Sequence, residues 1–296
     1  MLLISPKHPI RYRGMQSVIP PIEQAQVSLP CCNPQIWILS RKGMHALAQR
    51  LKTSSVQLRG DLEFVNHWEF FMPDFSSRLE NLIPVGPFAG TLEAFETGVK
   101  LRTRYEYLRQ QALDHNQTIF WASDSKRVEE TARYFAAGFY GIDWEDVATL
   151  HVVPETSDLG GDTLTPGVTC KNYRDTTNEE GHDKGYRKLD EFKSTYLPAI
   201  AERLHEQDPE INFSETDVLT MQEMCGFELL AKGDSPWCDV FSYEEWMNFE
   251  YARDILHFYR AGAGNRYAPT MGTLFLNATK NLLIQGPEAG PLFFSL

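Results

Sequence analysis

The chain has 296 residues, 42% of them hydrophobic and 12% aromatic, and its formal net charge is -12 at pH 7. This composition is typical of a globular protein with one large core or two lobes, and it excludes an intrinsically disordered chain. The negative charge argues against binding of nucleic acid through its phosphate backbone. No apolar run of the sequence reaches the length that spans a bilayer. We therefore expect neither a nucleic-acid partner nor a membrane span.

The order of the predicted elements indicates an α/β fold. Short runs rich in β-branched and aromatic residues predict strands at 36–40, 118–122, 151–154 and 291–296. Longer amphipathic segments predict helices at 90–113, 125–140, 186–206, 215–231, 243–260 and about 267–284. Alternating strands and helices favour a parallel or mixed central sheet that is flanked by helices.

The middle of the chain predicts helices without strands. A loop rich in Gly, Thr and Asp at 159–166 and a polar segment up to Lys184 precede three consecutive helical patterns without an intervening strand. We therefore predict a smaller all-α lobe at 156–262, inserted into an α/β lobe that comprises 1–155 and 263–296.

The segment Ile36-Trp37-Ile38-Leu39-Ser40-Arg41-Lys42-Gly43-Met44-His45 reads as a strand that runs into a basic turn. A strand that delivers an arginine to the carboxyl edge of a sheet is a usual place for an anion site in an α/β fold. The planar guanidinium of arginine makes two parallel hydrogen bonds to phosphate. The alternative is a surface Arg-Lys pair beside a strand, and this segment taken alone favours that alternative.

Five ordered blocks of the sequence carry a resemblance to a known family; they lie at 58–68, 86–90, 125–132, 159–166 and 285–294. The chain resembles the histidine acid phosphatases, in particular the fungal low-pH acid phosphatase and phytase branch, over nearly all its length. The resemblance implies a two-lobed phosphatase fold, no cofactor, and a small phosphorylated substrate or inorganic phosphate as ligand. It also implies hydrolysis of phosphate monoesters, such as phytate or other organic phosphates, at acidic pH.

The phosphate-binding turn of that family reads Arg-His-Gly-x-Arg-x-Pro, and its histidine is the nucleophile. In this comparison Arg41 is the phosphate-binding arginine, Lys42 occupies the place of the nucleophile, and His45 stands where the family has a second arginine. A lysine stays cationic in acid, so Lys42 could bind phosphate but should not form the covalent intermediate. His45 could act as a nucleophile in principle, although it lies three residues further along the turn.

Arg127 follows the predicted strand 118–122 and stands at the start of a helix. The resemblance implies that it is a second phosphate ligand, and the free amide groups and dipole of a helix start also favour an anion. The alternative is an arginine that caps the helix and pairs with Glu129 or Glu130.

In the family the last strand leads into a His-Asp dipeptide whose aspartate is the general acid. The given sequence stops at Leu296, before that dipeptide, so we expect a C-terminally truncated fold without this acid. General acid catalysis typically contributes about 10²–10⁴-fold to a rate. The loss of nucleophile and acid together predicts weak or absent phosphatase activity.

Cysteines and glycosylation sequons favour a secreted ancestry. The chain has five cysteines, an odd number, so at least one is unpaired or pairs with another chain. The resemblance implies a disulfide between Cys225 and Cys238. Asn-x-Ser/Thr sequons occur at Asn116, Asn212 and Asn277. The N-terminus shows no secretory signal, so the location stays open between extracellular by ancestry and cytoplasmic as written.

Three functions follow as alternatives. The first is an acid phosphatase by descent with reduced or abolished activity, and the second is a non-catalytic pseudophosphatase that binds a phosphate ligand or a partner. The third is an enzyme that uses Lys42 as a base or Schiff-base former on another substrate. His182, His205 and His257 lack metal-ligand spacing, so we expect no metal site. The edge of the last predicted strand leaves homo-oligomer formation open.

Overall fold

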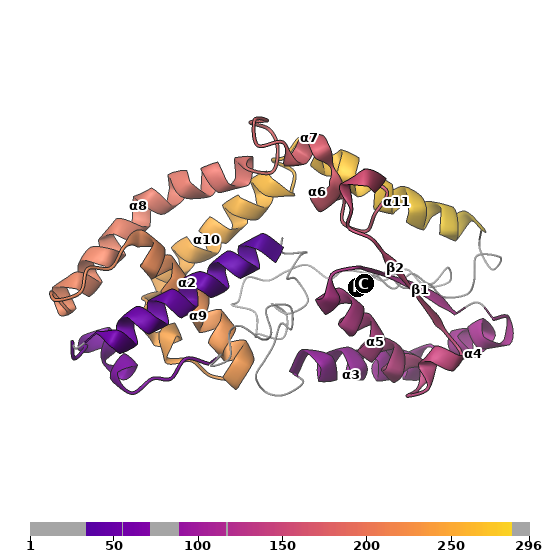
Figure 1. The fold of residues 1–296 in the computed structure, drawn as a ribbon, viewed down its shortest axis with the longest axis horizontal. Coiled ribbons are helices and arrows are strands. Elements are labelled where there is room, and N and C mark those ends of the chain that lie inside the picture. Colours follow the sequence, from indigo (N-terminus) through magenta and orange to yellow (C-terminus); the bar gives the residue numbers. More distant parts are fainter. Residues whose placement is uncertain (1–33, 55, 72–88, 117, 286–296) are drawn as a thin grey trace. The chain divides into compact units, whose positions relative to one another are not determined.

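The computed structural model describes residues 34–54, 56–71, 89–116 and 118–285 (Figure 1). The chain divides into two compact units, which we describe separately. Unit 1 comprises Met1–Cys32, Gly90–Cys170 and Pro269–Leu296, and unit 2 comprises Asn33–Ala89 and Lys171–Ala268. This division differs from the expected one mainly in 33–89, which belong with the helical unit.

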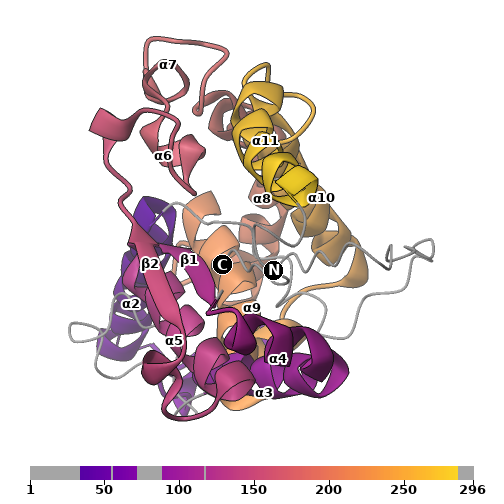
Figure 2. The ribbon, with the colours of Figure 1, turned by 90° about the vertical axis from the view of Figure 1, so that its right-hand side faces the viewer.

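Unit 1 contains a β-α-β motif at its centre. Strand β1 (Ile119–Ser123) pairs in parallel with β2 (Thr149–Val153), with Ile119 opposite Thr149 and Ser123 opposite Val153. Helix α5 (Lys126–Tyr140) connects the two strands, as a parallel pair requires (Figure 2). The remaining elements of the unit are α3 (Ala89–Arg104), α4 (Glu106–Asp114), η2 (Trp144–Asp146), η3 (Ser157–Leu159), α6 (Pro166–Thr169) and α11 (Ala268–Gln285).

The core of unit 1 lies between the sheet and α5. Phe120 of β1 and Phe135 and Phe139 of α5 are almost completely buried, and Trp144 closes the same cluster. Alternate residues of β1 point to this core, which is the period-2 pattern of a strand with one covered face. The α/β fold class is therefore confirmed, and the sheet within the described residues has two parallel strands.

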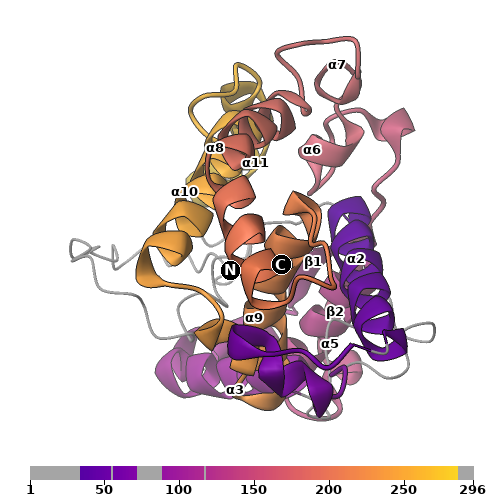
Figure 3. The same ribbon diagram turned by 90° about the vertical axis from the view of Figure 1, so that its left-hand side faces the viewer.

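Unit 2 is helical. Its elements are α2 (Pro34–Thr53), η1 (Gly60–Asn66), α7 (Lys171–Arg174), α8 (Lys184–Gln207), α9 (Glu215–Lys232), η4 (Pro236–Asp239) and α10 (Tyr243–Arg260) (Figure 3). Capping boxes start two of its helices: Ser214 with Asp217 begins α9, and Ser242 with Glu245 begins α10. The side chain of Trp237 is fully buried in the core of this unit.

The strand predicted at 36–40 is wrong, because these residues belong to α2. Met44, Leu47 and Leu51 are buried at helical spacing against unit 2, and Arg50 forms an ion pair of 2.8 Å with Asp217 of α9. The apolar run at 36–39 is the first part of this longer helical pattern. A short apolar run does not by itself distinguish a strand from a helix. The packing of α2 on α9 also explains why this part of the chain belongs to unit 2.

The other predictions agree with the structure where it describes them. All six predicted helices are present, although the segment 90–113 is divided into α3 and α4 at Tyr105. The strand expected at 151–154 is β2, which begins two residues earlier. The strand predicted at 291–296 lies outside the described residues. In the described part of the chain, no helix is long and apolar enough to cross a membrane.

Candidate functional site

The predicted phosphate ligand Arg127 follows the carboxyl end of β1 in the β1–β2 pair. Strand β1 ends at Ser123, and α5 begins three residues later at Lys126. The amide of Asp124 donates to the carbonyl of Val153 at 3.1 Å and holds the two strand ends together. The carbonyl of Ser125 accepts the amide of Val128 at 2.8 Å, so Ser125 is the N-cap of the helix. Ligands of α/β proteins usually bind beyond this edge of the sheet.

The first turn of α5 can offer its backbone to a ligand. The first amide groups of a helix have no intrahelical acceptor, and the helix dipole adds partial positive charge there. The side chain of Ser125 makes no capping hydrogen bond to these amides. Lys126 and Arg127 are the first two residues of the helix, so both cations belong to the anion-favouring end.

Glu129 near the start of α5 has a cationic partner in the same helix. The carboxylate of Glu129 accepts hydrogen bonds from Nε and Nη2 of Arg133 at 3.1 and 2.9 Å. Arg133 also donates to Glu145 at 3.0 Å. Glu129, Arg133 and Glu145 therefore form one ion-pair group.

The other predicted site residues lie on α2 in unit 2. Arg41 and Lys42 are in the middle of this helix, and His45 follows one turn later. The half-buried ring of His45 packs edge-on against Phe70, with 5.7 Å between ring centroids. Amide groups inside a helix are used by the helix itself, so this segment does not form a turn that cradles phosphate through its backbone. Arg127 lies in unit 1, so the structure does not bring the four predicted residues together within one unit.

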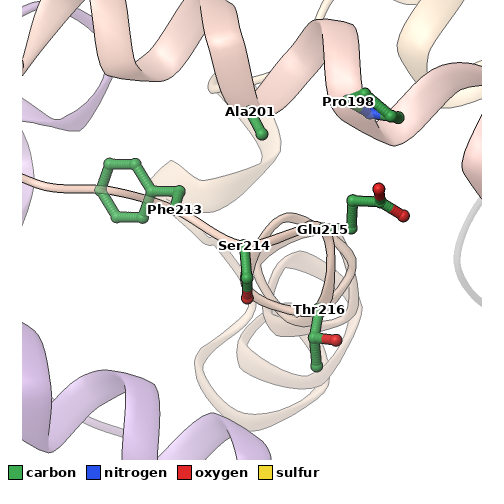
Figure 4. A pocket seen from close by; sticks show the side chains of 6 residues that line it. All are labelled: Pro198, Ala201, Phe213, Ser214, Glu215 and Thr216. Carbon is green, nitrogen blue, oxygen red and sulfur yellow. The ribbon is translucent and has the colours of Figure 1, made fainter.

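An open groove in unit 2 does not suit phosphate. It has a volume of about 610 Å³ and lies between α8 and the start of α9 (Figure 4). Its lining residues are Pro198, Ala201, Phe213, Ser214, Glu215 and Thr216, none of which is cationic. The hydroxyl of Ser214 already accepts the amide of Asp217 in the capping box. The acidic Glu215 at this groove would repel a phosphate group.

The comparisons with known proteins decide the family. The family model of the histidine phosphatase superfamily (branch 2) matches residues 39–291. The chain belongs to this superfamily. It is 33% identical over 260 residues to the phytase PHO112 of Candida albicans, and 31% identical over 258 residues to the acid phosphatase PHO1 of Komagataella pastoris. Each alignment covers 86% of this chain.

The fold of the superfamily is also seen in a solved relative. The crystal structure of the phytase from D. castellii is 31% identical, with a TM-score of 0.77 over 86% of this chain. The chain spans about half the length of the relatives it matches: 54% and 53% of the two curated proteins and 55% of the solved chain. The match of the family model begins at residue 39, within α2.

The predicted disulfide is confirmed. Cys225 of α9 and Cys238 of η4 are bonded, and Cys170 is a free, partly exposed thiol. Asn116, Asn212 and Asn277 are all exposed. Within the described ranges, no group of His, Cys, Asp and Glu side chains could hold a metal ion.

Lys126 stands beside Arg127 at the start of α5 and was not among the predicted site residues.

Proposed function

We propose that the chain binds phosphate, or a small phosphate ester, at the carboxyl edge of the β1–β2 pair. Arg127 and the amide groups of the first turn of α5 serve as ligands, and Lys126 adds positive charge. The observation that carries this proposal is the helix start that follows β1, with no side-chain cap from Ser125 and with Glu129 paired to Arg133. The proposed ligand also agrees with the names of the relatives, which are phytases and acid phosphatases.

We further propose that phosphate-ester turnover is weak or absent. The two segments that form this edge, 123–128 and 153–157, contain no histidine to act as the nucleophile. Lys42 and His45, which the motif comparison assigns to the reacting turn, lie on a continuous helix. This placement favours a phosphate-binding pseudophosphatase over an acid phosphatase with reduced activity.

Two assays test the proposal. Inorganic phosphate at a hundred times its dissociation constant should stabilise the folded chain by about 2.7 kcal/mol and raise its melting temperature. Hydrolysis of an aryl phosphate across an acidic pH series should give little turnover. An unchanged melting temperature would contradict phosphate binding. Robust turnover would contradict the proposed loss of phosphatase activity.

We also propose that the protein matures in an oxidising compartment outside the cytoplasm. The Cys225–Cys238 disulfide and the exposure of all three sequon asparagines support this location. Mass spectrometry of the protein from its own source should show N-glycans on Asn116, Asn212 or Asn277 and a non-reduced Cys225–Cys238 peptide. Unmodified asparagines together with two free thiols would contradict the proposal.

A further inference from the structure

In unit 2, a buried network of hydrogen bonds connects the loop at 175–183 to the end of α10. The amide of His182 donates to the carbonyl of Tyr173 at 2.8 Å, and the hydroxyl of Tyr173 donates to the carbonyl of Arg260, also at 2.8 Å. The side-chain amide of the buried Asn265 donates to the carbonyl of Gly181 at 3.2 Å and to that of Tyr259 at 3.0 Å. These bonds join the loop to both sides of the turn that follows α10.

Two glycines allow this close approach. A Cβ atom on Gly181 would lie 2.6 Å from the carbonyl oxygen of Tyr173. A Cβ atom on Gly185 would lie 2.7 Å from the carbonyl oxygen of Leu256 and 2.7 Å from Cβ of Arg260. The backbone at both glycines therefore packs directly against neighbouring backbone. A small displacement of the loop would break these close contacts.

The imidazole of His182 lies at the centre of the network. Its ring packs between Tyr173 and Tyr186, with centroid distances of 5.5 and 5.2 Å. Nδ1 lies 2.8 Å from a carboxylate oxygen of Asp183. Nε2 is buried and has no hydrogen-bond partner in the described part of the chain. The side chain as a whole is 11% exposed.

This geometry favours the neutral ring. When Nδ1 carries the hydrogen and donates it to Asp183, Nε2 is a bare lone pair, which an apolar contact tolerates. A second proton would create a buried N–H without an acceptor, and unmet buried donors are costly.

The charged and titratable neighbours of the ring come from three elements. Arg174 comes from α7, Asp183 and Tyr186 from the start of α8, and Arg260 from α10. Burial lowers the pKa of His182 below its usual 6.5; the bond to Asp183 opposes this shift, and Arg174 and Arg260 add to it.

We propose that the loop at 175–183 is a proton-operated latch, which neutral His182 holds against the end of α10 and which protonation of His182 releases. The hydrogen bonds of the latch involve residues near both ends of the segment 171–268. Tyr173 lies two residues after Lys171, where the chain enters unit 2, and Asn265 lies three residues before Ala268, where the chain leaves it. Release of the latch in acid frees these two connections at the same time.

The direction of the pH effect follows from linkage. The pKa of His182 is lower in the folded chain than in the unfolded chain. The contribution of neutral His182 to the stability of the closed loop is therefore fully present above about pH 6.5 and is lost as the pH falls toward the lowered pKa. A single proton changes the opening equilibrium by at most about tenfold per pH unit in this window.

Hydrogen exchange of the full chain between pH 7.5 and 4.5 tests the latch. After correction for intrinsic exchange, two backbone amides of the loop should open up to about tenfold more readily per pH unit below 6.5: that of His182, which donates to Tyr173, and that of Gly181, which donates to Asn178. The amide of Asp217, which is held by the capping box of α9, is the internal control and should not follow this profile. Protection of the loop amides that does not change with pH would overturn the proposal.

Two variants test whether His182 itself causes the pH dependence of the loop. His182→Gln should flatten the pH profile of the loop amides, whatever its effect on the overall stability. His205→Gln, which alters an exposed histidine of α8, should leave the profile as in the wild type. If His182→Gln does not fold, the nitrogen-15 titration of His182 in the wild-type chain replaces it. A ring that titrates at or above 6.5, or a variant that keeps the full pH profile, would overturn the latch.

Discussion

The indole nitrogen of Trp68 lies 2.8 Å from a carboxylate oxygen of Glu228, and this pair joins the loop after η1 to α9 inside unit 2. The side chain of Glu228 is fully buried. Its carboxylate also accepts hydrogen bonds from Ser235 at 2.7 Å and from Lys232 at 2.7 Å. Three donors converge on one buried carboxylate, and this explains how a charged group is accommodated in the core.

Removal of that carboxylate should destabilise unit 2 strongly. Glu228→Ala leaves the Trp68 and Ser235 donors buried without an acceptor, and we expect a loss of about 3 kcal/mol in the free energy of unfolding by urea. Lys188→Met is the control, because Lys188 pairs with Glu191 on an exposed face of α8 and its loss should leave the stability nearly unchanged. Equal losses for the two variants would contradict the central role of the carboxylate.

Two glycines set the approach of α3 and α5 in unit 1. A Cβ atom on Gly98 would lie 2.3 Å from the carbonyl oxygen of Phe135, and one on Gly138 would lie 2.1 Å from that of Phe95. Gly98→Ala should therefore lower stability by about 2 kcal/mol or more, although alanine is the better helix former. Gly226→Ala in α9, where nothing lies within 4 Å, should instead raise stability by up to about 1 kcal/mol. Thermal unfolding of both variants distinguishes the two cases.

The Cys225–Cys238 disulfide should contribute to the stability of unit 2. It closes a loop with a sequence separation of 13 residues, for which chain entropy predicts about 3 kcal/mol. Unfolding of Cys225→Ser with Cys238→Ser, compared with the wild type under non-reducing conditions, measures this contribution. Cys170→Ser is the control and should leave the midpoint nearly unchanged, since Cys170 forms no disulfide.

His257 of α10 should make the fold less stable in acid. Burial, together with Arg253 and Arg260, lowers its pKa from 6.5 to about 4. A folded pKa below the unfolded one means that stability is retained above 6.5 and falls as the pH drops from 6.5 toward 4. His257→Gln should reduce the pH slope of the unfolding free energy in that interval. Identical slopes for variant and wild type would contradict this reading.

The sequence predicts most of the helices correctly because each is long, amphipathic and well bounded. The helix starts predicted at 215 and 243 agree with the structure, in which Ser214 with Asp217 and Ser242 with Glu245 form capping boxes. The strand-helix pattern around Arg127 likewise predicts β1 and α5 within one or two residues.

The interpretation of 36–45 failed for a physical reason. Ile36 to Leu39 are apolar in succession, and the motif comparison placed a turn after them, although Met44, Leu47 and Leu51 continue with helical spacing. The packing of α2 on α9 favours a helix at 36–45, and the local sequence does not reveal this tertiary contact. The buried networks around Glu228 and His182 could not be predicted either, because their members are distant in sequence.

The most direct test of the central claim is calorimetric titration of inorganic phosphate into the wild type, Arg127→Ala and Lys100→Ala. Lys100 is an exposed cation on α3 and controls for the loss of one positive charge. Loss of a charge-assisted ligand should weaken phosphate binding by roughly 10- to 100-fold in Arg127→Ala, while Lys100→Ala keeps the wild-type affinity. Equal affinity in Arg127→Ala and the wild type would contradict a phosphate site at the carboxyl edge of the β1–β2 pair.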